Sequence, residues 1–505
     1  MSAFKLVIPM EIWADVLFFG VGPPAQEKAM AEHGRRELRD RRKIVVQVCR
    51  GWKKAAWKYL FIDPYLPTPQ SLHQFTSILV SADKKWDDLR HSPHSLPGAY
   101  VRTLDLSHLC YEAKPVSASS SSSVSRLADI VHRPWMQSQL LCQLIPLVPS
   151  VETLVLPSGE GGLMLSRGIF LRALKESELS SNLKRLKGLG MLMNGVIDGR
   201  GVDPLVSLLE GLPALEELSV VGGGGVDMPP SDEFIENNPQ PMLYLKNLQH
   251  LSLIGIRSSL LLQALIDSDL PELTSLHLTS YHSTEWDLTT PLLQKHGWKL
   301  KSLTFIHLPD FPQPALPFPE NTLLICPSLE SLQFETFPHN TPPSLSFFDP
   351  IPPPVPAETS VRPAPPPPPS KLRHVILPRP PNSKPATEGY KRLMSDLSHP
   401  SVLPSLSSLT FTKFNWVHSP NGGSGGASSA GTNGIIREWA IMLGKRGVVV
   451  LDGKNKPCPD LAEVGGKWLL AELVKRRTVS ALVGRERRRR SVRSWDDSEQ
   501  SEDGG

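Results

Sequence analysis

An α/β solenoid that follows a small helical unit is the fold that this 505-residue sequence predicts. Two observations predict the solenoid: a leucine-containing phrase that keeps returning from residue 101 onward, and short helical patterns between its copies. A third observation, an N-terminal stretch with the apolar period of helices, predicts the helical unit. Four parts are predicted: a helical domain at 1–62, a connecting helix or loop segment at 63–100, a solenoid at 101–455, and a C-terminal helix with a charged, disordered tail at 456–505.

The returning phrase has the form L-x-x-L-x-L, in which apolar and polar residues alternate as in a short strand. DPLVSLLEGL and SLLLQALIDSDL, which lie between copies, predict helices. One strand-plus-helix unit cannot bury its own apolar face, whereas stacked units share one. An ordinary α/β domain with leucine-rich strands is the alternative. The copies are VRTLDL (101), VETLVL (151), LKRLKG (183), LEELSV (215), LQHLSL (248), LTSLHL (273), LKSLTF (300), LESLQF (329), LRHVIL (372) and LSSLTF (406).

The spacing of the copies is uneven, from 25 residues (248 to 273) to 50 residues (101 to 151), so the solenoid is expected to curve irregularly. Low-complexity insertions are expected at 117–125, 341–371 and 418–434. The proline run in the second is expected to be an extended spacer, with recruitment of a proline-recognition domain as the alternative. After the third, IIREWAIMLGKRGVVVLDG predicts a closing helix and strand that cap the solenoid.

The N-terminal unit contains two helical patterns. LVIPMEIWADVLFFG has proline at a suitable first helical position, and IVVQVCRGWKKAAWKYL gathers an apolar arc that leaves Val46 and Trp57 on its charged side. Together they resemble the F-box, the motif by which substrate receptors dock on the adaptor of cullin-based ubiquitin ligases. The matching residues are Ile8, Pro9, Glu11, Ile12, Val16, Leu17, Val48, Cys49, Arg50 and Trp52.

This resemblance implies a substrate-recognition subunit of an SCF-type ubiquitin ligase, with the adaptor and the cullin as partners and a protein as target. The repeats resemble leucine-rich repeats, although the expected Asn or Cys after each phrase is mostly missing, and the combination resembles the F-box families of filamentous fungi and mushrooms. The charged segment 22–42 is longer than the middle of a typical F-box. The alternative is a repeat scaffold without ligase association. The expected adaptor-binding residues are Ile8, Pro9, Ile12, Leu17, Val48 and Trp52, with Trp57 added as an outward-facing aromatic.

No catalytic, cofactor-binding or metal-binding pattern is convincing, so the chain is expected not to be an enzyme and to need no cofactor. GGSGG at 422–426 fits a nucleophile motif only formally, because it lies in a Gly/Ser run. Five scattered cysteines predict neither disulfides nor zinc. A net charge of +4 and the lack of an apolar run of about 20 residues point to neither a nucleic-acid nor a membrane partner. The expected location is the cytoplasm, the nucleus or both.

Target binding is expected on the exposed face of the strands, where the residues between the leucines form columns across stacked repeats. This face is expected to be mostly neutral and hydrogen-bonding, with Lys187 beside Ser219 in the second column. The alternative is that these are simply solvated strand residues. The predicted target-binding residues, near the middle of the two columns, are His250, Ser252, Ser275, His277, Ser302 and Thr304.

The tail contains two basic clusters, 475–477 and 485–490, whose spacing resembles a bipartite nuclear import signal. If they act as one, replacing Arg487–Arg490 with neutral residues shifts a tagged protein toward the cytoplasm, because the receptor loses the charges that it reads. Imaging of parent and variant checks this, and an unchanged distribution would leave the tail as solvated charge.

Overall fold

The computed structural model describes residues 44, 47, 59–89, 96–107, 109, 134–157, 167–191, 203–222, 241–256, 259–279, 288–308, 318–319, 321–337, 342–343, 370–381, 384–416 and 432–458. The chain divides into two compact units. The first comprises Met1–Leu300 with Leu308–Pro317, and the second comprises Lys301–His307 with Phe318–Gly505. Among the described residues, eleven strands run in parallel arrangement, β1–β6 in the first unit and β7–β11 in the second. The α/β class is therefore confirmed.

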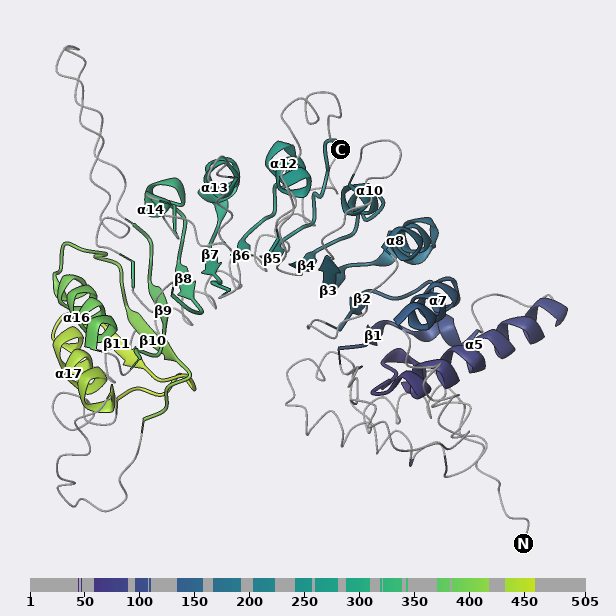
Figure 1. The fold of residues 1–505 in the computed structure, drawn as a ribbon, viewed down its shortest axis with the longest axis horizontal. Coiled ribbons are helices and arrows are strands. Elements are labelled where there is room, and N and C mark those ends of the chain that lie inside the picture. Colours follow the sequence, from purple (N-terminus) through teal and green to yellow (C-terminus); the bar gives the residue numbers. More distant parts are fainter. Residues whose placement is uncertain are drawn as a thin grey trace, which may run out of the picture. The chain divides into compact units, whose positions relative to one another are not determined.

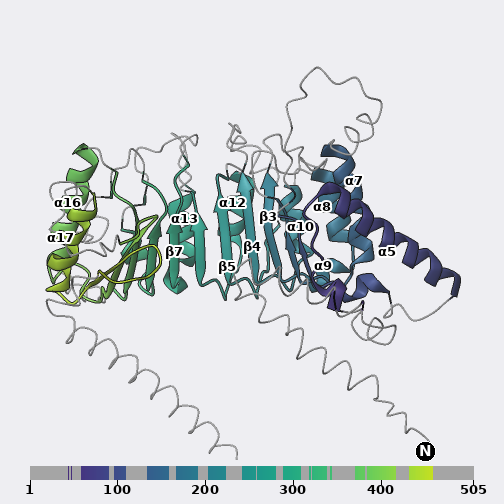
Figure 2. The ribbon, with the colours of Figure 1, turned by 90° about the horizontal axis from the view of Figure 1, so that it is seen from below.

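In the first unit the strands pair in chain order, and the helices lie on one side of them (Figure 1). Figure 2 shows β3, β4 and β5 running side by side in the same direction. The strands are β1 (Thr103–Asp105), β2 (Thr153–Val155), β3 (Arg185–Met191), β4 (Glu217–Gly222), β5 (His250–Ile254) and β6 (Ser275–Leu278). The helices are α5 (Pro69–Leu89), α7 (Pro134–Leu144), α8 (Arg167–Glu176), α9 (Leu179–Asn182), α10 (Pro204–Glu210), α12 (Ser259–Asp267) and α13 (Thr289–His296), with single turns η2 (Pro97–Tyr100), η3 (Ile145–Leu147) and η4 (Gly297–Lys299).

The second unit repeats the plan. Its strands are β7 (Ser302–Phe305), β8 (Ser331–Phe334), β9 (His374–Pro378), β10 (Ser408–Thr412) and β11 (Val449–Leu451), and its helices are α14 (Thr322–Ile325), α16 (Lys384–Ser398) and α17 (Thr432–Gly444). All ten leucine-containing phrases thus form strands, and the helices predicted from DPLVSLLEGL and SLLLQALIDSDL are α10 and α12. The closing helix and strand are α17 and β11.

Inward-facing aliphatic residues stack in register and form the core of each unit. Burying one such side chain stabilises a protein by about 1.5–3 kcal/mol, and here the burial requires a neighbouring repeat on each side. In the first unit the stack, at most 2% exposed, is Leu104, Leu154, Leu186, Leu218, Leu251 and Leu276. In the second unit it is Leu303, Leu332, Val375, Leu409 and Val450, all at 0% exposure.

Backbone hydrogen bonds fix the same register from repeat to repeat. The carbonyl of Arg102 accepts the N–H groups of Glu152 at 2.8 Å and Thr153 at 3.1 Å, and the carbonyl of Glu152 accepts those of Lys184 and Arg185. The pattern continues along the first unit and recurs in the second. One carbonyl therefore anchors the start of the next strand, and a slip of one residue would break both bonds.

Proline turns introduce several strands, as the sequence predicts. The N–H of Leu215 donates to the carbonyl of Leu212 at 3.3 Å, across Pro213. Proline suits this position because its ring fixes φ near the value that the turn needs. The side-chain amide of Asn247 then donates to the carbonyl of Pro213 at 3.0 Å, which ties one repeat to the turn of the preceding one.

Aromatic rings fill the core of the second unit where the first unit has aliphatic side chains. The rings of Phe305 and Phe334 stack with centroids 5.8 Å apart, and Phe318 packs edge-on against them at 5.1 and 5.0 Å. Tyr390 of α16 stacks on Trp439 of α17 at 6.1 Å. Such pairs stabilise beyond the area they bury, so these two helices are fixed against each other by ring contacts.

The predicted boundary at residue 62 falls within a packed contact. Tyr59 and Phe61 are buried, the ring of Phe61 lies 6.2 Å from that of Phe75 in α5, and the carbonyl of Ile62 accepts the N–H of Arg102 at 2.9 Å. Residues 59–62 therefore belong with the connection and the first repeat. Composition alone did not indicate this, because these contacts join residues far apart in the sequence.

Two other predicted boundaries shift slightly. Helix α17 begins at Thr432, inside the predicted insertion 418–434. Leu451 of β11 forms an antiparallel bridge with Pro457, so the described end of the chain extends past residue 455 and closes on the last strand. The adaptor-binding residues predicted from the resemblance, Ile8, Pro9, Ile12, Leu17, Val48, Trp52 and Trp57, lie outside the described residues, as do residues 117–125 and the tail from residue 459.

A buried carboxylate organises the turn after β11. Asp452 is 2% exposed, and it accepts the backbone N–H groups of Lys456 at 2.8 Å, Lys454 at 2.9 Å and Trp416 at 3.3 Å. Burial acts to raise the pKa of the Asp452 carboxyl group, but the hydrogen bonds outweigh it and hold the pKa below its usual value. The charged form is therefore the one that the fold stabilises.

We expect Asp452→Asn to lower the free energy of unfolding by about 2 kcal/mol at pH 7. The NH2 group of the asparagine amide would face backbone N–H groups, and two donors cannot form a hydrogen bond with each other. Since the folded pKa is depressed, the contribution of the carboxylate is present above the unfolded value of about 3.9 and is lost as the pH falls through the folded value. Urea denaturation from pH 7 down to about pH 3 should therefore show the variant and the parent converging.

The matched control is Glu388→Gln, which changes an exposed carboxylate paired with Lys391 at 3.7 Å in the same unit. It should cost no more than about 0.5 kcal/mol. An equal loss in both variants, or a difference that does not vary with pH, would contradict the role given to Asp452.

Candidate functional site

The open face of the first unit is the side of the sheet away from α7, α8, α10 and α12 (Figure 1). Side chains of alternate strand residues lie on it, because the residues between them are the buried leucines. This arrangement leaves polar and charged groups of successive repeats in lateral contact. It is the candidate functional site.

Four of the predicted target-binding residues meet on β5 and β6. His250 pairs in register with Ser275, and Ser252 pairs with His277. His250 is exposed, and the other three are partly accessible. The structure thus brings together two imidazoles and two hydroxyl groups, which offer hydrogen-bond donors and acceptors without a fixed charge.

The other two predicted residues, Ser302 and Thr304, lie on β7 of the second unit. Ser302 is partly accessible, but Thr304 is only 2% exposed, so the expectation that its side chain lies on an exposed face is wrong. Strand alternation places Thr304 on the same side as Ser302. The alternation of strand residues determines the side of the sheet on which a side chain lies. It does not determine whether other parts of the chain cover that side chain.

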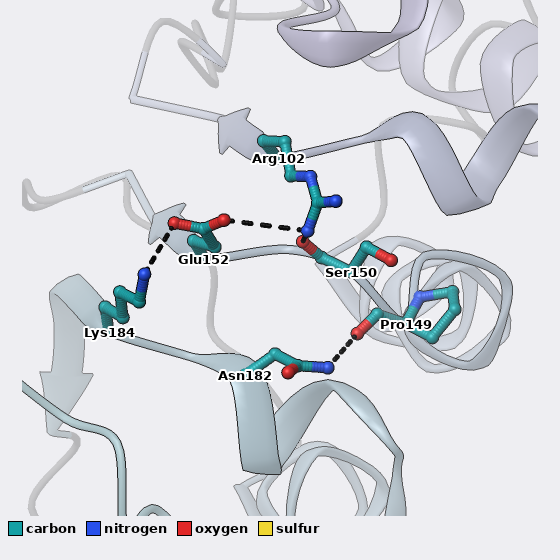
Figure 3. Close-up of polar contacts among 6 residues, drawn as sticks. All are labelled: Arg102, Pro149, Ser150, Glu152, Asn182 and Lys184. Atoms are coloured by element: carbon teal, nitrogen blue, oxygen red, sulfur yellow. Dashed lines mark hydrogen bonds and ion pairs between the residues drawn. The ribbon is translucent and has the colours of Figure 1, made fainter. Parts of the chain in front are cut away.

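Ion pairs join residues at the starts of successive strands in the first unit. Glu152 pairs with Arg102 at 3.6 Å and with Lys184 at 3.0 Å, so one carboxylate links three strands (Figure 3). In the same view the amide of Asn182 donates to the carbonyl of Pro149 at 3.0 Å. Arg102, Glu152 and Lys184 precede β1, β2 and β3, so they are not among the column residues that are expected to be mostly neutral.

A second set of ion pairs joins β3 to β4. Lys187 pairs with Glu217 at 2.8 Å, and Arg185 lies 3.9 Å from carboxylate oxygens of Glu216 and Glu217. The signal for the charged ladder was present in the sequence: the first variable position of successive phrases reads Arg102, Glu152, Lys184, Glu216. The two columns of the prediction used the second and third variable positions, so this first position was left out.

A β-bulge in β3 changes the second column. Gly188 has φ of 71°, and a Cβ atom there would lie 2.2 Å from the carbonyl oxygen of Leu156, so both the conformation and the close approach require glycine. The register with β4 shifts at this point. Uniform stacking of the repeats predicts that Lys187 pairs with Ser219. Because of the bulge, the two residues are not paired.

Buried titratable groups serve the core rather than the open face. His296 is 1% exposed, with Nε2 2.9 Å from the carbonyl oxygen of Leu265. Burial lowers the pKa of His296, so the ring is neutral at pH 7 and donates to this carbonyl near the end of α12. Burial raises the pKa of the Cys326 thiol to about 12, which keeps it protonated and unreactive.

Within the described residues, no three His, Cys, Asp or Glu side chains gather into a group able to hold a metal ion. No helix of that part of the chain is long and apolar enough to cross a bilayer. No family model matches the sequence, and no curated protein is significantly similar to it. The fold and the site therefore define a solenoid-like α/β protein with an open, polar sheet face.

We expect Glu152→Gln to lower the free energy of unfolding by no more than about 1 kcal/mol, although it breaks both pairs of the ladder in Figure 3. The three side chains are 38–52% exposed, where water and salt screen their attraction. Urea denaturation at low and at high salt measures the loss, which should vanish at about 1 M NaCl. A loss of several kcal/mol that persists in salt would show that the ladder is a structural necessity.

Proposed function

We propose that this chain is the substrate-recognition subunit of an SCF-type ubiquitin ligase. The observation that carries the proposal is the order of its parts: an N-terminal segment that resembles the F-box, followed by stacked repeats with an open polar face. The F-box-like segment docks on the adaptor through Ile8, Pro9, Ile12, Leu17, Val48, Trp52 and Trp57. The repeats hold a protein target.

The charge arrangement of the open face supports a protein target over nucleic acid. Nucleic-acid binding needs cations that are free to neutralise phosphates. In β1–β4 and just before these strands, the cations Arg102, Lys184, Arg185 and Lys187 each lie within 4 Å of a carboxylate. The neighbouring hydroxyl and imidazole groups of β5 and β6 suit the hydrogen-bonding groups of a polypeptide.

In this function the chain itself makes and breaks no covalent bond. Its role is to hold a target so that the charged ubiquitin, carried by partner subunits, meets the target's lysines at high effective concentration. The proposed location is therefore where such ligases work, in the cytoplasm, the nucleus or both.

A repeat scaffold without ligase association is the second candidate, and one observation favours it. Segment 22–42 is longer and more charged than the middle of a typical F-box, and this insertion falls between the two helical patterns that carry the resemblance. If the insertion prevents the two helices from packing together, the adaptor cannot bind, whereas the repeats still bind their target.

We expect adaptor and cullin to co-purify with the full chain and to be lost when residues 1–58 are removed. The deletion stops at 58 because Tyr59, Phe61 and Ile62 pack on α5 and the first repeat. Immunoblotting of the purified complexes gives the result, and the melting temperature of the truncated protein shows that the repeats remain folded.

A point variant provides the matched control. Ile12→Asp should abolish adaptor binding in the full chain, whereas Ile44→Asp, at a position that is 63% exposed, should leave it unchanged. Adaptor that still co-purifies with the truncated chain contradicts the docking assignment. Absence of adaptor from the full chain favours the scaffold.

A further inference from the structure

The open face of the first unit ends, at the carboxyl side of β3–β5, in a row of residues without charge. Gly190 pairs with Val221, and Val221 pairs with Ile254. Val221 and Ile254 are partly accessible and Gly190 is exposed, whereas the residues that precede them, Leu189, Val220 and Leu253, are buried. We call Gly190, Val221 and Ile254 the carboxyl strip.

Gly190 has no side chain although the local structure does not require glycine. Among the described residues, a Cβ atom built on Gly190 meets no atom within 4 Å, and the φ of Gly190 is not among the positive values found in this unit. Three other glycines in and beside the strip's strands differ. Gly188 is required by its conformation and by Leu156, and a Cβ on Gly222 would lie 1.8 Å from the carbonyl oxygen of Gly255. Gly255 has φ of 60°, and a Cβ atom there would lie 2.8 Å from the side chain of Leu308. The open space over Gly190 therefore lies beside an accessible valine, on a backbone that is otherwise tightly packed.

The bulge at Gly188 sets the position of this open space. Because the register shifts there, Gly190 rather than a bulky or charged residue comes opposite Val221. Bulges of this kind re-aim side chains and occur often beside functional sites.

Polar groups border the strip on the side toward the middle of the sheet. Ser252 pairs with Ser219 on one side and with His277 on the other. The nearest cation of the second column, Lys187, is paired with Glu217 at 2.8 Å. An apolar centre with hydrogen-bonding groups at its border matches the usual composition of a protein interface.

The lengths of the connecting segments also distinguish the carboxyl edge of the sheet in the first unit. In the first unit long segments follow β1 (106–133) and β3 (192–203), whereas the segment before β3 (183–184) and the one after β5 (255–258) are short. In repeat proteins, insertions collect on one side of the stack, and this side often carries the binding surface.

We propose that the carboxyl strip is the centre at which this chain recognises its target, and that the occupant is an extended protein segment with an uncharged, apolar side chain. That side chain lies over Gly190 against Val221 and Ile254, and the main chain of the segment bonds to Ser252 and His277. A charged side chain would lose its hydration there without gaining a partner. The proposal rests on the proposed function, since it names the part of a target that the receptor reads.

The test uses the full chain and a display library of random short peptides as the probe. Peptides selected on the parent protein should share an apolar, uncharged core. Binding of the strongest, measured by fluorescence anisotropy, should weaken at least about tenfold in Gly190→Trp, because the indole fills the space that the peptide side chain needs. Val221→Thr keeps the shape and removes apolar surface, so it should also weaken binding.

Arg172→Trp, which places an indole on an exposed position of α8 instead, is the matched control and should bind like the parent. Circular dichroism melts verify that each variant is folded. Equal affinity of the parent and both strip variants overturns the proposal, as does selection of charged peptides or of none. Binding of a single-stranded oligonucleotide that Gly190→Trp abolishes overturns it as well.

The strip variants also separate this proposal from the ligase role. Gly190→Trp should still co-purify with adaptor and cullin, because the change lies far in sequence from the F-box-like segment. A chain that binds selected peptides through the strip but never retains adaptor would refute the ligase role and leave the strip in place.

Discussion

Stacking of inward leucines in register is the constraint on which each unit depends. Leu218 is buried because Leu186 and Leu251 occupy the same position in the strands on either side. A strand of three to seven residues cannot exclude water from its own leucines, so every repeat is stable only as part of a stack. Once the leucines are in register, the outward residues are in register too, and the open face follows from the core.

An unpaired strand edge exposes hydrogen-bonding groups to other chains, so the first strand of the first unit and the last strand of the second unit each need cover. At the start of the first unit, Tyr65 bridges to Asp105 of β1, and the carbonyl of Ile62 accepts from Arg102. At the end of the second, Leu451 bridges to Pro457. Both closures use short irregular segments, and the second depends on the buried charge of Asp452.

The open face of the first unit has two regions with different chemistry. From the start of β1 to β4, acidic and basic side chains pair with one another. At the carboxyl side of β3–β5 the row is apolar, and hydroxyl and imidazole groups border it. The bulge at Gly188 separates the regions, because the register between β3 and β4 shifts there, between Lys187 on one side and Gly190 on the other.

The sequence by itself determined the strands, the helices α10, α12 and α17 and the direction of each strand side chain, because period-two alternation and recurring leucines are local properties of the chain. The proline turns and the closing pair α17–β11 were predicted for the same reason. Tertiary structure decided which outward residues are accessible: it buries Thr304, pairs Lys187 with Glu217, and brings Gly190 opposite Val221. It also joins residues 59–62 to the first repeat. These features arise from contacts between repeats, where a positive φ at one glycine or the packing of a distant segment alters what the repeating pattern predicts.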